Sequence, residues 1–276
     1  MKTSMTTPRR AAGFSITDLV IVVAVIAAML AIQIPTDAAA RRTARRMQNS
    51  TQLRGIHQGL VIFGQSNKFF YPGLNSKGTI LPDNAANTGN SGDGDTVQAR
   101  YWIMLRGDFF TPEYIISPSE TANVWEYDWR ADPLQTPVKW DEREKNYSYA
   151  MLHIAGDANA APAAGVRASE WKETANTQAI VLSDRNTGTN ATNQVASIHT
   201  AERGEWKGSV LWNDNHVMFE QTHDQFMTRY GNGELLADDN FNGTDNLFAA
   251  DVDGEGNADA DALMVIAGDS TVHGGE

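Results

Sequence analysis

An unbroken apolar run near the N-terminus constrains this chain more than any other feature. Every residue from Leu19 to Ile32 is apolar. The run is long for a buried strand and somewhat short for a membrane span, which needs about 20 residues. A helix from Phe14 to residue 34 would measure about 31 Å, the thickness of a bilayer core. We therefore expect a helix over residues 14–35 that can cross a membrane.

Three kinds of N-terminal segment have this composition. Basic residues before the run and Ala38-Ala39-Ala40 after it suit a secretory signal peptide cleaved after Ala40. An uncleaved membrane anchor is the second kind. The third is a leader that is removed ahead of the run. Arginines follow the run as closely as basic residues precede it, so the distribution of charge does not fix the orientation.

The residues that start the run favour the third kind. The sequence Gly13-Phe14-Ser15-Ile16-Thr17-Asp18-Leu19 resembles the prepilin signal of type IV pilins and type II secretion pseudopilins. In that family a prepilin peptidase cuts after the glycine and methylates the new N-terminal phenylalanine. Asp18 stands where the family usually has glutamate. Pro35 also lies where pilins commonly carry a proline.

The resemblance implies roles for these residues. Gly13 and Phe14 would flank the cut, and Asp18 would neutralise the new amino group of a neighbouring subunit during assembly. A carboxylate beside an apolar run is costly in lipid unless it has a partner, which agrees with that role. The alternative role of Asp18 is to cap the start of the helix together with Ser15 or Thr17.

The helix should continue beyond the membrane as an amphipathic segment over 36–70. Leu53, Ile56, Leu60 and Phe63 recur at three- and four-residue steps, which predicts one buried face. An aromatic-Pro-Gly turn follows at residues 70–73. This stretch also resembles pilin-like proteins, nearest the major pseudopilin group.

A globular head should occupy residues 71–231, with polar loops at 83–99 and 155–165. Strands are expected in residues 101–105, 147–154 and 179–184. A hairpin is expected in 208–220 around Asn213-Asp214-Asn215. The predicted fold class is therefore α+β, with one long N-terminal helix on a small antiparallel sheet, as in pilins.

Nothing in the sequence favours an enzyme. The chain has no Gly-x-Ser-x-Gly, no Walker loop, no HExxH and no dinucleotide fingerprint. Three histidines, His199, His216 and His223, could join Asp184 or Asp214 in a triad or metal site, but their spacing matches no ligand pattern. Cysteine is absent, so the chain has no disulfides, thiolate metal ligands or cysteine nucleophile. We expect hydrogen-bonded or solvated histidines and no catalysis.

The net charge of −12 is concentrated at the C-terminus. Of the 34 acidic residues, eleven lie after Asn232, where there is no Lys or Arg, which leaves 23 acids against 22 bases in the rest. This balance argues against nucleic acid as a partner. Within the acidic segment, 232–276, oxygen ligands recur at calcium-loop spacing, and they are Asp251, Asp253, Glu255, Asn257 and Asp259.

That segment resembles an EF-hand or dockerin loop, with Gly256 at the sharp turn. It departs at the twelfth position, where Ala262 replaces the bidentate acid. The alternative is a solvated acidic tail.

Together these features predict a leader over 1–13 and a structural subunit of a type II secretion pseudopilus or type IV pilus-like filament. Before assembly it would lie in the bacterial inner membrane, with its N-terminus in the cytoplasm and its head outside. Its expected partners are the prepilin peptidase, other pilin or pseudopilin subunits and membrane lipid. Calcium is the one cofactor that the sequence suggests. The rival hypothesis is an exported binding protein or enzyme whose signal peptide is cleaved after Ala40.

Overall fold

A computed structural model of the chain describes residues 13–81, 96–120, 146–154, 166–188, 195–200, 202, 204–230, 246–248, 262 and 264–265. The side chains of residues 32–38, 166 and 265 are outside this description. The chain divides into two compact units, Met1–Ala44 and Arg45–Glu276.

One long helix, α1 (Ile16–Ser66), belongs to both units. It begins two residues after Phe14 and ends just before the predicted turn. Its N-terminal part is apolar, and all side chains from residue 13 to residue 31 are exposed. Among the residues described above, no helix combines the length and the apolarity of a membrane span.

The C-terminal part of α1 packs in the core of the second unit. Leu53, Ile56 and Leu60 are fully buried, and Phe63 is partly buried against the same core. The predicted buried face is therefore confirmed. Glycines on this part of the helix let other segments approach closely, because a Cβ at Gly59 would lie 3.2 Å from both Met104 and Phe110.

The core of the second unit contains a five-stranded sheet of order β4-β3-β2-β1-β5 in which all pairings are antiparallel. Its strands are β1 (Tyr149–Leu152), β2 (Ile180–Asp184), β3 (Gly208–Trp212), β4 (Val217–Glu220) and β5 (Met264–Val265). Strands β1, β2 and β3 are buried along their whole length. The structure is therefore α+β with an antiparallel sheet, as the sequence predicts.

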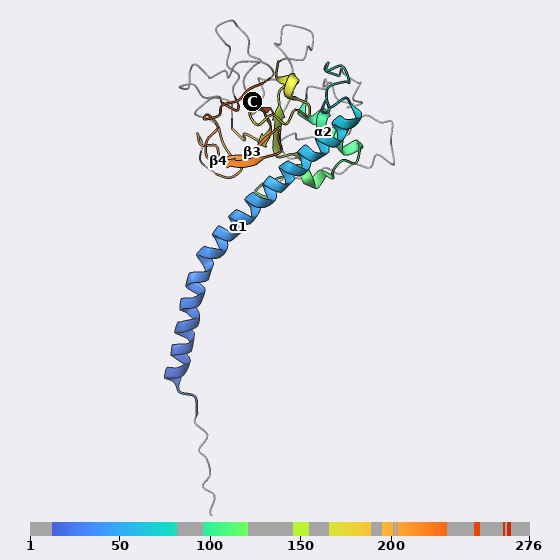
Figure 1. Ribbon diagram of the computed structural model, residues 1–276. Helices are drawn as coiled ribbons and strands as arrows, with labels where there is room; N and C mark the ends of the chain where they lie inside the picture. The colour runs from blue at the N-terminus through green and yellow to red at the C-terminus, as the bar shows by residue number, and fades with distance from the viewer. Residues whose placement is uncertain are drawn as a thin grey trace, which may run out of the picture. The chain divides into compact units, whose positions relative to one another are not determined.

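The predicted hairpin is confirmed. Strands β3 and β4 lie side by side (Figure 1), with Val210 opposite Met218 and Leu211 opposite Val217. Asn215 in the connecting turn has φ of 69°, a conformation that asparagine tolerates better than most residues.

The prediction of a strand at residues 101–105 is wrong. These residues belong to the helix α2 (Val97–Arg106), which also takes the last three residues of the loop predicted over 83–99. The Thr96 side chain caps this helix by accepting from the Ala99 N–H at 3.2 Å, and Gly107 ends it. An apolar run this short is compatible with both the helical and the strand repeat of apolar residues. The flanking cap residues therefore decide between helix and strand.

Two short 3₁₀ helices complete the described elements, η1 (Pro112–Ile115) and η2 (Val166–Glu170). The aromatic-Pro-Gly turn forms as predicted, and Gly73 there has φ of 98°. Leader residues 1–12, the loop 155–165 and all five predicted calcium ligands lie outside the described residues. Ala262, the twelfth position of the predicted calcium loop, is buried in the core, as is Met264.

Candidate processing and assembly site

The segment Gly13–Asp18 forms the start of helix α1. Ser15 is the N-cap residue: its Oγ accepts from the Thr17 N–H at 3.2 Å, and its carbonyl accepts from the Leu19 N–H at 3.2 Å. In return, the Ser15 N–H donates to Asp18 Oδ2 at 3.1 Å. This pattern is a variant of the capping box, with aspartate where glutamate is usual and with the serine Oγ bonded to the second helical N–H in place of the third.

Asp18 therefore has a local role in the uncleaved chain. Its carboxylate lies in the first turn of the helix, where negative charge is favoured by the helix dipole. It also holds the amide of Ser15, the residue that follows Phe14. The capping role that the sequence left open is present, and it leaves the assembly role of Asp18 untested.

Gly13 and Phe14 are accessible. Phe14 is 79% exposed, and among the described residues no atom beyond the chain neighbours lies within 4 Å of a Cβ built on Gly13. The folded chain therefore does not require glycine at position 13. A requirement for glycine at position 13 would therefore come from a partner that binds this segment.

The apolar surface after Asp18 surrounds the helix. Eleven large apolar side chains between residues 14 and 30 are between 46% and 81% exposed. A helix that is apolar on all sides is normally buried, in lipid or among other helices. In the described part of the chain, this apolar surface of α1 is left exposed.

The histidines considered as catalytic or metal-binding residues lie in separate contacts. His199 Nε2 lies 2.8 Å from Asp184 Oδ2, and the His199 ring packs edge-on against Phe219. His216 pairs with Asp214 and stacks on Trp212. In the described part of the chain, no group of three or more acidic or histidine side chains is arranged to hold a metal ion.

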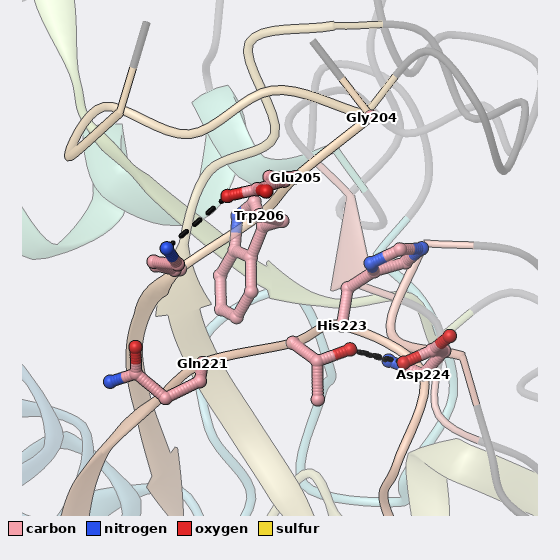
Figure 2. Close-up of a pocket in the computed structure, with 8 residues that line it drawn as sticks. Gly204, Glu205, Trp206, Gln221, His223 and Asp224 are labelled. Carbon is pink, nitrogen blue, oxygen red and sulfur yellow. Dashed lines mark hydrogen bonds and ion pairs between the residues drawn. The ribbon is translucent and has the colours of Figure 1, made fainter. Parts of the chain in front are cut away.

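His223 lines a polar pocket of about 310 Å³ (Figure 2). At the rim of this pocket Glu205 and Lys207 form an ion pair at 3.2 Å, and Thr222 donates to Asp224. Burial lowers the pKa of His223, so the ring is neutral at neutral pH. These two pairs occupy the charged groups of the lining, whereas His223 Nε2 has no hydrogen-bond partner among the described residues.

Sequence reasoning missed a buried polar cluster where α1 meets the sheet. Asn49, fully buried, donates to Asp184 Oδ1 at 2.8 Å and to Ser209 Oγ at 3.0 Å. Its own oxygen accepts from Ser117 and Tyr149. Asn49 lies four residues before Leu53, on the predicted buried face of the helix. That position is the sequence signal from which its burial could have been predicted.

Comparisons of the chain with protein families, with curated proteins and with solved structures gave no match.

Proposed function

We propose that this protein is a pilin-like structural subunit, processed by a prepilin peptidase and assembled into a type II secretion pseudopilus or a type IV pilus-like filament. The observation that carries the proposal is the order of features in one short segment. An accessible Gly13-Phe14 pair, a carboxylate at Asp18 and a helix apolar on all sides follow one another within residues 13–31.

Filament assembly would cover the exposed apolar surface of the N-terminal part of α1. In a bundle of such helices the exposed apolar side chains pack against one another, and before assembly bilayer lipid covers them. Cleavage after Gly13 leaves an ammonium group on Phe14 in this apolar environment. The Asp18 carboxylate of a neighbouring subunit neutralises that charge, since an unpaired charge is costly there.

The rest of the chain supplies the head. Helix α1 continues from its apolar N-terminal part into the second unit, where buried residues of its C-terminal part pack in the core of an antiparallel α+β structure. In this proposal the protein is an inner-membrane protein with its head outside the cytoplasm, and its partners are other subunits of the filament. It performs no catalysis.

Sequencing the N-terminus of the mature protein tests the proposal. We expect Phe14 as the first residue, N-methylated, in cells that have a prepilin peptidase, and the full precursor in cells without one. Gly13→Leu should leave the precursor uncut, whereas Gln58→Leu, an exposed change elsewhere on α1, should be processed normally. Normal cleavage of Gly13→Leu would refute the peptidase assignment.

Asp18→Ala tests assembly separately from cleavage. This variant should be cleaved but should form few filaments, while Asp18→Glu, the residue usual in the family, should assemble. Filaments are counted by electron microscopy of sheared fractions. If Asp18→Ala assembles as well as the wild type, the carboxylate acts only in the capping box with Ser15.

The rival function is an exported binding protein released by cleavage after Ala40. The observation in its favour is that the second compact unit begins at Arg45, shortly after that site. In that case the mature N-terminus would be Arg41 and would not depend on a prepilin peptidase. The same sequencing experiment separates the two functions.

A further inference from the structure

We propose that Thr174 and Asn213 form an intramolecular ester cross-link, with Glu170 as the base. This inference does not depend on the filament function. It rests on a buried carboxamide that is surrounded by the groups an acyl transfer needs: a nucleophile, a base for that nucleophile and donors to the developing oxyanion.

The nucleophile and its base are in contact. The Thr174 hydroxyl donates its hydrogen to Glu170 Oε2, so the lone pairs of Oγ1 face other groups. Glu170 is 7% exposed, and Thr174 is half-buried. A carboxylate that holds a hydroxyl hydrogen in a site of low solvent access is placed to accept that proton.

The nitrogen of the Asn213 carboxamide has more acceptors than hydrogens. Nδ2 lies 2.7 Å from the Glu170 carbonyl, 2.8 Å from the Lys172 carbonyl and 2.8 Å from Thr174 Oγ1. An NH₂ group carries two hydrogens. If these point to the two carbonyls, Oγ1 faces the carboxamide with a lone pair, 2.8 Å from Nδ2, the atom bonded to the Cγ that it would attack.

The oxygen of the same carboxamide lies against polarising groups. The Tyr71 hydroxyl donates to Asn213 Oδ1 at 2.9 Å, and His57 Nε2 lies 3.3 Å from it. Burial raises the pKa of Tyr71, so this donor keeps its proton. Burial lowers the pKa of His57, so the ring is neutral and its Nε2–H tautomer can donate to the same oxygen.

The step balances without a further reactant. Thr174 Oγ1 bonds to Asn213 Cγ while its proton passes to Glu170, and the negative charge develops on Oδ1 beside Tyr71 and His57. The Cγ–Nδ2 bond then breaks, and the nitrogen takes the proton from Glu170 and leaves as ammonia. Asn213 is 2% exposed, which keeps competing water away from its carbonyl. The half-buried Thr174 side gives the ammonia a route out.

The cross-link would join the segment after η2 to the start of the β3–β4 turn. It would have the cross-linking role that a disulfide has in other proteins, in a chain that has no cysteine. Because it closes a loop between positions 174 and 213, it would restrict the unfolded chain and raise the melting temperature.

Peptide mapping of the purified full-length protein tests the cross-link. Trypsin should separate Thr174 and Asn213 into the peptides 173–185 and 208–229. We expect these two peptides to appear joined, as one species lighter than their sum by the mass of one ammonia. Hydroxylamine, which cleaves esters, should release both.

Matched variants identify the groups involved. Thr174→Ser should keep the joined species, Thr174→Val and Glu170→Gln should lose it, and the exposed Thr177→Ala in the same peptide should retain it with the expected mass change. Thr174→Val should also melt several degrees lower than Thr177→Ala.

Three results would overturn the proposal. The first is recovery of both wild-type peptides at their sequence masses. The second is Asn213 converted to aspartate, which would show attack by water. The third is a loss of ammonia confined to the peptide 208–229, which would show a succinimide at Asn213. Because the assay reads the wild-type protein directly, it does not depend on the folding of any variant.

Discussion

Buried polar side chains fix the position of α1 on the sheet at the scale of single residues. Asp184 has no exposed surface, and it accepts from the Asn49 side chain, from the Ser209 N–H at 2.6 Å and from His199. A buried carboxylate is tolerated only when donors surround it. The same donors would lose their partner if the carboxylate were removed.

Asp184→Ala should therefore destabilise the head by about 3 kcal/mol, because it leaves buried donors on Asn49 and Ser209 unsatisfied. Asp214→Ala is the matched control, since its pair with His216 is partly exposed and is worth at most about 1 kcal/mol. The measurement is urea unfolding followed by tryptophan fluorescence. All seven tryptophans lie at or after Trp102, so the signal reports on the head. Equal losses in both variants would show that the buried cluster adds nothing specific.

Two buried histidines predict a pH dependence. The pKa values of His57 and His223 are lowered from their ordinary value of 6.5, in both cases mainly by burial. Below pH 6.5 the unfolded chain therefore binds more protons than the folded chain. Stability is complete above pH 6.5 and is lost as the pH falls below it, by up to about 1.4 kcal/mol per pH unit for each histidine.

The check is the melting temperature between pH 7.5 and about pH 5. His57→Gln should reduce the slope of melting temperature against pH, because one of the two groups is removed. Gln65→Ala, a change of an exposed side chain that does not titrate, should leave that slope unchanged. A wild-type protein equally stable at both ends of the range would contradict the prediction.

At the scale of elements, glycines in α1 are explained by their neighbours. Glycine lowers helix propensity by up to about 1 kcal/mol relative to alanine. At Gly64, however, a Cβ would lie 3.0 Å from the Phe69 carbonyl oxygen. The Phe69 N–H donates to the Gly64 carbonyl at 2.7 Å, so the chain folds back tightly over the end of the helix.

Gly64→Ala should therefore destabilise the head by about 1 kcal/mol, even though alanine is the better helix former, because the crowding atoms are backbone and cannot rotate away. Gln65→Ala, one position later and exposed, should have an effect within about 0.5 kcal/mol. Urea unfolding of both variants in parallel decides this. A stabilised Gly64→Ala would mean that the segment after Ser66 moves freely.

At the scale of the whole molecule, the charge is unevenly distributed along the chain. Eleven acidic residues and no Lys or Arg follow Asn232. Clustered carboxylates repel one another, and hard cations such as calcium relieve that repulsion. The residues that would bind calcium lie outside the described part of the chain, so calcium binding stays a prediction from the sequence.

Millimolar calcium should stabilise the protein by about 2.7 kcal/mol if the dissociation constant is near 10⁻⁵ M. The melting temperature should rise by a few degrees. Asp251→Asn with Asp253→Asn should remove the rise. Magnesium and salt serve as controls. An unchanged melting curve in calcium would identify the segment as a solvated acidic tail.

The sequence by itself determined the features that depend on local order. The apolar helix, its buried face at Leu53, Ile56 and Leu60, and the hairpin around Asn215 follow from periodicity and turn chemistry, which act between near neighbours. Sequence reasoning missed the helix at Val97–Arg106 because a short apolar run fits both the helical and the strand repeat, and because its N-cap, Thr96, lies in the predicted loop 83–99.

Only the tertiary structure decided which distant residues meet. It pairs Asn49 with Asp184 and brings Thr174 to Asn213. The donors and acceptors in these pairs are separated by 135 and 39 positions in the chain. Local sequence patterns do not predict such contacts, because the contacts depend on how the helix, the sheet and the loops pack together.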